Sequence, residues 1–183
     1  LYYLMECNGK ELLSSITILK NTLTLSKERM QIVDLLAQPS TRITTLSVTA
    51  SGYTVNKEEM PDTEKLASDV VAIREGRYND VVTTMGTIAA GLHKRYTQGI
   101  DPFIVMSCDN ISYNGDLTKR VLSHIAESVD PAFGAYVRDK TLFPNSVVDR
   151  VTPEQNFEQQ EAQDRKSTRL NSSHEWISRM PSS

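Results

Sequence analysis

The chain has 183 residues, 39% hydrophobic and 23% charged, which suits one domain with a real core and is too little for two large ones. A formal net charge of -3 without any basic run argues against nucleic acid as a partner. The longest strongly apolar run, Phe103–Met106, falls far short of the roughly 20 residues that span a bilayer, so we expect no membrane partner.

The first residues and the cysteines indicate where the protein works. Leu1 opens a run with no initiator Met, no basic segment and no small-residue cleavage site, so we expect neither a signal peptide nor a natural start. Cys7 and Cys108 are too few for a disulfide framework, which favours reduced thiols and a cytoplasmic setting.

Apolar periodicity, turn residues and β-branched runs together predict alternating helices and strands. In chain order, we predict a helix at 26–37, a strand at 42–50, a polar loop at 56–79 with at most a short helix at 63–70, a helix at 81–98, a strand at 103–108, a helix at 116–128, a shorter helix at 131–139 and an extended segment at 143–150.

The clearest signals mark the ends of helices. Ser26 suits the N-cap of the first helix, and Pro39 stops it. Gly99 suits a left-handed cap after the helix at 81–98. Pro131 suits the first turn of the last helix, because its fixed φ is already helical and its missing N–H costs nothing there.

The order of helix, strand, helix, strand and helix predicts an α/β fold with a doubly wound parallel sheet. The strands at 42–50 and 103–108 are expected to be buried, as central parallel strands are. Ligands of such sheets bind beyond the carboxyl ends of the strands, which directs attention to residues 49–52 and 108–110. No GxGxxG turn and no P-loop is present, so the sequence by itself indicates no phosphate cradle.

Few side chains are candidates for reactive chemistry. His93 and His124 lie on predicted helices without a partner at metal-ligand spacing, so we expect no metal and predict both at the surface. Cys108 closes an apolar strand and is predicted to pack in the core rather than act as a nucleophile. Ser107 beside it is assigned to packing as well.

A polar cluster follows the strand at 103–108, at the turn into the next helix. Asn114 and Asp116 are predicted to serve the turn and the helix start, which Asn and Asp favour. Asn110 has two interpretations that its position leaves open. It is either a turn former or a neutral amide that donates a hydrogen bond to an oxygen gaining negative charge.

These residues also carry a family resemblance, over nearly all of residues 1–153. The motifs are Phe103-Ile104-Val105-Met106-Ser107-Cys108-Asp109-Asn110, Asn114-Gly115, Asp130-Pro131, Phe143-Pro144-Asn145 and Val148-Asp149-Arg150-Val151-Thr152-Pro153, preceded by Pro39-Ser40-Thr41-Arg42-Ile43 and by Leu46-Ser47-Val48-Thr49 with Gly52-Tyr53. They resemble the polyol-specific long-chain dehydrogenase/reductase family, of the mannitol 2-dehydrogenase and fructuronate reductase type. Ala50 departs from the pattern, because the family has Glu there, so a carboxylate near the active site is absent.

The resemblance implies a partial, Rossmann-like NAD(P)-binding domain and metal-independent hydride transfer to or from an open-chain sugar derivative of the mannitol and fructose type. It makes Asn110 the catalytic oxyanion donor, in contact with substrate, and Val148 with Asp149 the border of the substrate pocket. Thr49 and Asp109, at the two strand ends, are the expected cofactor contacts, with NAD favoured over NADP. The implied partner is a small sugar alcohol or keto sugar acid, and the full-length protein is expected to be monomeric.

The family's catalytic Lys, with a partner Asn and His, belongs to a C-terminal helical domain, and its glycine-rich cofactor turn belongs before Leu1. We therefore expect the chain by itself to be inactive. Two alternatives stay open. One is fructuronate (mannonate) reduction, and the other, of a different class, is a non-catalytic nucleotide-binding α/β module.

Composition divides the chain into three parts. Residues 1–153 are the predicted partial domain, and residues 154–163 form a polar linker rich in Glu and Gln. Residues 164–183 show no helical or strand periodicity and resemble the translated read-through of a common sequencing-library adapter. We expect this tail to be non-native and disordered.

Overall fold

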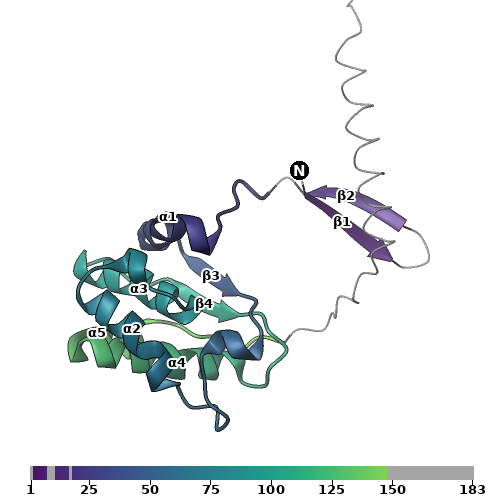
Figure 1. Ribbon diagram of the computed structural model, residues 1–183. Coiled ribbons are helices and arrows are strands. Elements are labelled where there is room, and N and C mark those ends of the chain that lie inside the picture. The colour runs from purple at the N-terminus through teal and green to yellow at the C-terminus, as the bar shows by residue number, and fades with distance from the viewer. Residues whose placement is uncertain (1, 8–10, 17, 148–183) are drawn as a thin grey trace, which may run out of the picture. The chain divides into compact units, whose positions relative to one another are not determined.

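The computed structural model describes residues 2–7, 11–16 and 18–147 of the chain (Figure 1). Two short 3-10 helices, η1 and η2, lie among its strands and α-helices. In chain order the elements are β1 (Tyr2–Cys7), β2 (Glu11–Ile16), α1 (Leu25–Ala37), β3 (Ile43–Leu46), η1 (Ala50–Tyr53), α2 (Thr63–Arg74), η2 (Tyr78–Asp80), α3 (Thr84–Thr97), β4 (Ile104–Ser107), α4 (Asn114–Val129) and α5 (Pro131–Lys140).

Strands β1 and β2 pair antiparallel as a hairpin, with Tyr2 opposite Ile16 and Cys7 opposite Glu11. This hairpin was not predicted. Neither of its runs shows the strict alternation of apolar and polar residues that marks a half-buried strand.

The second sheet holds the predicted pair of parallel strands, in which Ile43 of β3 lies opposite Ile104 of β4. β3 is shorter than the predicted strand at 42–50, and the prediction that it is buried is wrong. Only Leu46 of its side chains is buried, whereas Ile43 is 55% exposed. Among the described residues β3 pairs with β4 alone, which leaves its other edge without a neighbouring strand.

Helix α1 ends at Ala37 as predicted but begins earlier than the cap assigned to Ser26. Thr24 is the residue before the first turn, and its backbone N–H donates to the Glu28 carboxylate at 2.6 Å. The helix start is thus closed by a side chain reaching back from inside the helix, where a Ser or Thr hydroxyl was expected.

Helix α2 corrects the prediction of a loop at 56–79 with at most a short helix at 63–70, because the helix continues to Arg74. Asp62 caps its start by accepting a hydrogen bond from the Lys65 backbone N–H at 3.2 Å. In the sequence, polar residues between its apolar positions hid the helical periodicity of its buried face. That face consists of Leu66, Asp69, Val70, Ala72 and Ile73.

Helix α3 is the predicted helix at 81–98, although it begins three residues later. Its first turn is capped by the Thr83 hydroxyl, which accepts from the Gly86 N–H at 2.9 Å. Gly99 has a φ of 69°, so the predicted left-handed cap is confirmed. Every residue from 85 to 92 is buried, so α3 is a central helix rather than the one-faced helix that was predicted.

Helices α4 and α5 confirm the two helices predicted after β4, with α4 starting two residues early. The Asp130 carboxylate caps α5 by accepting from the N–H groups of Ala132 and Phe133. The predicted extended segment forms no strand as far as residue 147, but the Leu142 carbonyl accepts from the Val105 N–H of β4 at 3.0 Å. The rest of that prediction lies outside the described residues.

The core forms where α1 to α5 pack together beside β3 and β4 (Figure 1). Parallel strands joined through intervening helices confirm the α/β class, here with an incomplete sheet. No helix in the described part of the chain is long and apolar enough to cross a membrane. The largest fully buried side chains are Tyr53, Phe103, Phe133, Leu66, Ile73 and Met85.

Candidate functional site

The candidate site lies where β3 and β4 end side by side. Just beyond β3, the Val48 backbone N–H donates to the Asp109 carboxylate at 2.7 Å, although the two residues are 61 apart in sequence. The two segments singled out by the sequence, 49–52 and 108–110, are therefore brought to one edge of the sheet. This is the edge at which α/β folds place their ligands.

A buried cluster of hydrogen bonds joins the two strand ends. Tyr53, on η1, is 0% exposed, and its hydroxyl donates to the Asp109 Oδ2 at 2.5 Å. The Tyr53 hydroxyl also shares a hydrogen bond with the Ser107 hydroxyl, which in turn donates to the same Asp109 oxygen at 3.1 Å. Ser107 was assigned to packing alone, and that prediction is wrong, because its hydroxyl is part of the cluster.

The Asp109 carboxylate is 8% exposed and is satisfied by neutral donors, with no ion pair to a cation among the described residues. A buried carboxylate is costly unless hydrogen bonds replace its water, which these donors do. Burial, and then the hydrogen bond to Asp109, raises the pKa of Tyr53 to about 12. Tyr53 therefore stays protonated at neutral pH and acts as a donor.

Asn110 and Thr49 face solvent at this edge. Asn110 is exposed on the turn directly after Asp109, and no other described residue hydrogen-bonds its amide. Thr49 is exposed as well, with its hydroxyl 2.9 Å from that of Ser51. Gly52 keeps this turn close to β3, because a Cβ there would lie 2.8 Å from the Val48 Cβ.

Asn114 is completely buried and ties the turn after β4 to the chain beyond α5. Its Nδ2 donates to the Asp109 carbonyl at 2.9 Å, and its Oδ1 accepts from the Ser146 N–H at 3.0 Å. The prediction that Asn114 holds the turn is confirmed. Its reach to Ser146, 32 residues away in sequence, was not predicted.

The start of α4 is capped from outside the helix. Asn145 Oδ1 accepts from the N–H groups of Gly115 and Asp116, at 2.8 and 3.2 Å, so the cap comes from the Phe-Pro-Asn segment. Asp116 contributes by accepting from Asn145 Nδ2 at 3.1 Å instead of capping the helix itself. A Cβ at Gly115 would lie 2.6 Å from the Phe143 carbonyl oxygen, which explains the glycine.

The surroundings of the remaining candidates, one cysteine and two histidines, do not indicate a reactive group. Cys108 is half-buried, so the prediction of a core position is only partly met. His93 was predicted at the surface, but it is half-buried, with Nδ1 2.9 Å from the Tyr78 hydroxyl and its ring edge-on to Phe133. His124 is also partly buried. In the described part of the chain, no three or more His, Cys, Asp or Glu side chains gather as a metal site would require.

Two predicted site residues, Val148 and Asp149, lie outside the described residues. The sequence placed Tyr53 and Asn145 in motifs of the family resemblance but assigned neither a role in the site. Tyr53 carried a weak signal, because a Gly-Tyr pair just beyond a strand is a close turn followed by a large side chain with a polar tip. The capping role of Asn145 had no local signal, because the cap and the helix start are 30 residues apart in sequence.

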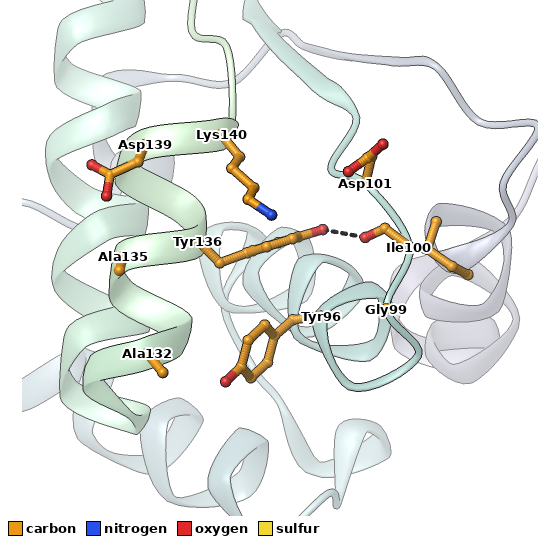
Figure 2. A pocket seen from close by; sticks show the side chains of 9 residues that line it. All are labelled: Tyr96, Gly99, Ile100, Asp101, Ala132, Ala135, Tyr136, Asp139 and Lys140. Carbon is orange, nitrogen blue, oxygen red and sulfur yellow. Dashed lines mark hydrogen bonds between the residues drawn. The ribbon is translucent and has the colours of Figure 1, made fainter.

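A cavity of about 410 Å³ lies at the opposite end of β4. Figure 2 shows Tyr96, Tyr136 and Lys140 around it, with the Tyr136 hydroxyl donating to the Ile100 carbonyl at 2.7 Å. Ile100 precedes β4, whereas the candidate site follows it, so the cavity is not part of the site.

The mannitol dehydrogenase Rossmann domain matches the chain over residues 1–177. Mannitol 2-dehydrogenase of Neosartorya fischeri is 33% identical over 159 residues, which cover 84% of this chain and 31% of the relative. Mannitol 2-dehydrogenase of Aspergillus clavatus is 35% identical over 133 residues, covering 69% of this chain and 25% of the relative. The chain thus spans about a third or less of these relatives.

Two solved structures of polyol dehydrogenases also match the chain, again over about a third of their own length. The ternary complex of Pseudomonas fluorescens mannitol 2-dehydrogenase with NAD and D-mannitol matches with a TM-score of 0.73 and 26% identity, covering 85% of this chain and 31% of that one. A D-sorbitol dehydrogenase in substrate-free form matches with a TM-score of 0.78 and 25% identity, over 91% of this chain and 34% of that one.

Proposed function

Because the chain belongs to the mannitol dehydrogenase Rossmann-domain family, we propose that it is part of an oxidoreductase that interconverts an open-chain sugar alcohol of the mannitol type and its keto sugar. Relatives named mannitol 2-dehydrogenase, and a neighbour that holds NAD and D-mannitol, support this substrate class. A nicotinamide cofactor, when bound, supplies the acceptor or donor of the hydride.

The observation that carries the proposal is the exposed amide of Asn110 at the carboxyl end of β4. An alcohol that loses its proton and then a hydride passes through a stage in which its oxygen carries negative charge. A neutral amide N–H fixed beside that oxygen stabilises the charge without changing its own protonation. Asn110 is therefore the proposed oxyanion donor, in contact with substrate.

The cofactor would lie across the two adjacent strand ends, where open α/β sheets bind dinucleotides. The Thr49 hydroxyl is exposed just beyond β3, where it would exchange its hydrogen bond with Ser51 for one to a ligand. Asp109 was expected to contact the cofactor too, but its carboxylate oxygens accept from Val48 and Tyr53 and its carbonyl from Asn114, so its proposed contribution is to hold the turn at the cofactor site. We propose NAD ahead of NADP, supported by the NAD in the Pseudomonas fluorescens complex.

Val148 and Asp149 are the proposed border of the substrate pocket. Support comes from the segment before them, since Asn145 and Ser146 bond to the start of α4, which directly follows the turn that carries Asn110. That docking places Ser146 beside the end of β4, where its hydroxyl donates to the Ser107 carbonyl.

The test uses the complete open reading frame that contains these residues, assayed for NADH formation with D-mannitol and for NADH oxidation with D-fructose. Asn110→Ala should lower kcat at least about tenfold, as loss of one oxyanion donor does. Asn110→Asp, which keeps the shape but replaces the donor by a negative charge, should be lower still. Asn79→Ala, an exposed Asn on η2, should behave as the unsubstituted enzyme.

Unchanged turnover in Asn110→Ala would return Asn110 to a turn-forming role. Reduction of fructuronate ahead of fructose would replace the mannitol class by the sugar-acid class. NAD binding without any polyol turnover in the complete protein would favour the non-catalytic module.

A further inference from the structure

Asp109, the residue directly before Asn110, is fixed by hydrogen bonds to both its carboxylate and its backbone carbonyl. Its carboxylate accepts from the Tyr53 hydroxyl at 2.5 Å and from the Val48 N–H at 2.7 Å. Its carbonyl accepts from the Asn114 Nδ2 at 2.9 Å. The carbonyl belongs to the peptide unit that joins Asp109 to Asn110, so these bonds together fix that peptide plane and the Cα from which the Asn110 side chain extends.

Tyr53 is too deeply placed to touch a substrate. It is 0% exposed, and its hydroxyl is occupied by Asp109 and Ser107. Its raised pKa keeps the hydroxyl protonated, so it serves as a donor and not as an acid or base in the reaction. Any effect of the Tyr53 hydroxyl on catalysis therefore passes through its partners, Asp109 and Ser107.

We propose that Tyr53 and Asp109 are positioning residues that hold the Asn110 amide in the orientation needed for hydride transfer, a role that rests on the proposed function of Asn110. An exposed amide whose Cα position was not fixed would lose donor strength through misalignment. A donor displaced by even about 1 Å stabilises the charged oxygen poorly. The buried pair prevents that displacement by joining the end of β3 to the end of β4.

The chain offers a matched control in Tyr136. This residue is also buried, its hydroxyl donates to the Ile100 carbonyl at 2.7 Å, and burial raises its pKa to about 12 as well. It lies at the other end of β4. Tyr136→Phe and Tyr53→Phe each remove one buried hydroxyl, but only Tyr53→Phe removes it from the turn that carries Asn110.

The experiment measures kcat, KM and thermal midpoint of the complete enzyme with D-mannitol and NAD. Tyr53→Phe should lower kcat about fivefold or more with KM for NAD changed less than about twofold, whereas Tyr136→Phe should leave kcat unchanged at a similar loss of midpoint. Asp109→Asn should lower kcat further, because its amide would place N–H groups against donors. If Tyr53→Phe fails to fold, Ser107→Ala removes one bond of the cluster and should give a smaller drop in kcat.

A double-mutant cycle shows whether the effect passes through Asn110. In the Asn110→Ala background, Tyr53→Phe should cause no further loss of kcat. Equal losses in both backgrounds, or a kcat for Tyr53→Phe matching that of Tyr136→Phe, would overturn the positioning role. An Asn110→Ala variant with full turnover would instead overturn the proposed function, which the cycle distinguishes because that variant is measured by itself.

Discussion

Arg95 keeps its positive charge inside the protein without an acidic partner among the described residues. It is 2% exposed, and its guanidinium donates to the carbonyls of Leu36, Gln38, Thr41 and Asp101. The same group lies over the Phe103 ring, 5.1 Å from its centroid. Burial lowers the pKa of Arg95, but the planar fork of five N–H groups replaces lost water with backbone oxygens.

Replacing Arg95 by Met should therefore lower the free energy of unfolding by about 3 kcal/mol, because the stem stays while the carbonyls lose a charged donor. Arg95→Lys should also be destabilising, since one ammonium cannot reach all four oxygens. Urea unfolding of the chain measures both. The control is Arg77→Met, which removes an exposed Arg with ion pairs to Glu75 and Asp80 and should leave the midpoint in place. Equal midpoints for Arg95→Met and Arg77→Met would contradict the structural role.

At the scale of elements, the start of α4 and the segment 141–147 form one unit. Asn145 caps the helix, and Gly115 leaves room for the carbonyls of Phe143 and Pro144, which a Cβ would meet at 2.6 Å. The same segment bonds to β4 through the Leu142 carbonyl and the Val105 N–H. Docking of this segment thus supplies a hydrogen-bond partner on the edge of β4 that β3 does not cover.

Gly115→Ala should lower the free energy of unfolding by about 2 kcal/mol, because the rigid backbone of the segment must move away. Asn145→Ala removes the cap without adding bulk and should cost about 1 kcal/mol. Hydrogen exchange of the Val105 amide, read by mass spectrometry or NMR, should become faster in both variants. Exchange as slow as in the unsubstituted chain would show that the segment stays docked without these contacts.

Helices with local signals were predictable, and contacts between distant segments were not. The apolar periodicity of α4 and α5 and the caps at Gly99 and Pro131 depend on neighbours within a few residues, which the sequence displays. The length of β3 depends instead on Gly52 folding back onto Val48, and its exposure depends on which strands pair beside it. A run of β-branched residues predicts neither the length of the strand nor its exposure.

The candidate site divides in the same way. The position of Asn110 followed from the end of β4, because a strand end is a local feature. The partners of Asp109 did not follow, since Tyr53 reaches it from 56 residues away through burial. Catalytic Asn110, the pocket border at 148–149 and the boundaries at 153 and 163 stay predictions.

At the scale of the whole molecule, stability should be highest between about pH 7 and pH 10. Burial lowers the pKa of His93 below its ordinary 6.5, with Asp130 opposing the effect, so the folded state binds this proton less tightly than the unfolded chain. That contribution is complete above pH 6.5 and is lost as the pH falls. Tyr53 and Tyr136, with pKa values raised to about 12, contribute fully below pH 10 and lose it as the pH rises toward 12.

Urea midpoints of the chain between pH 5 and pH 11.5 check this profile. His93→Phe keeps a ring against Phe133 and Tyr96 but cannot take up a proton, so its midpoint should fall less on acidification. In Tyr136→Phe, the urea midpoint should fall less as the pH rises above 10. If the urea midpoints of His93→Phe and of the unsubstituted chain fall equally on acidification, groups other than His93 cause the loss of stability at low pH.

The bonds of Arg95 have a consequence for the order in which the molecule assembles. They join α3 to carbonyls at and after the end of α1 that are 54 to 59 residues away in sequence. Closing a loop of that length costs entropy before any bond forms, so the corner between α1 and β3 gains its partners only once α3 has condensed with the rest of the core. We therefore expect that corner to form late in folding, together with the equally distant contacts of Asp109 with Val48 and Tyr53.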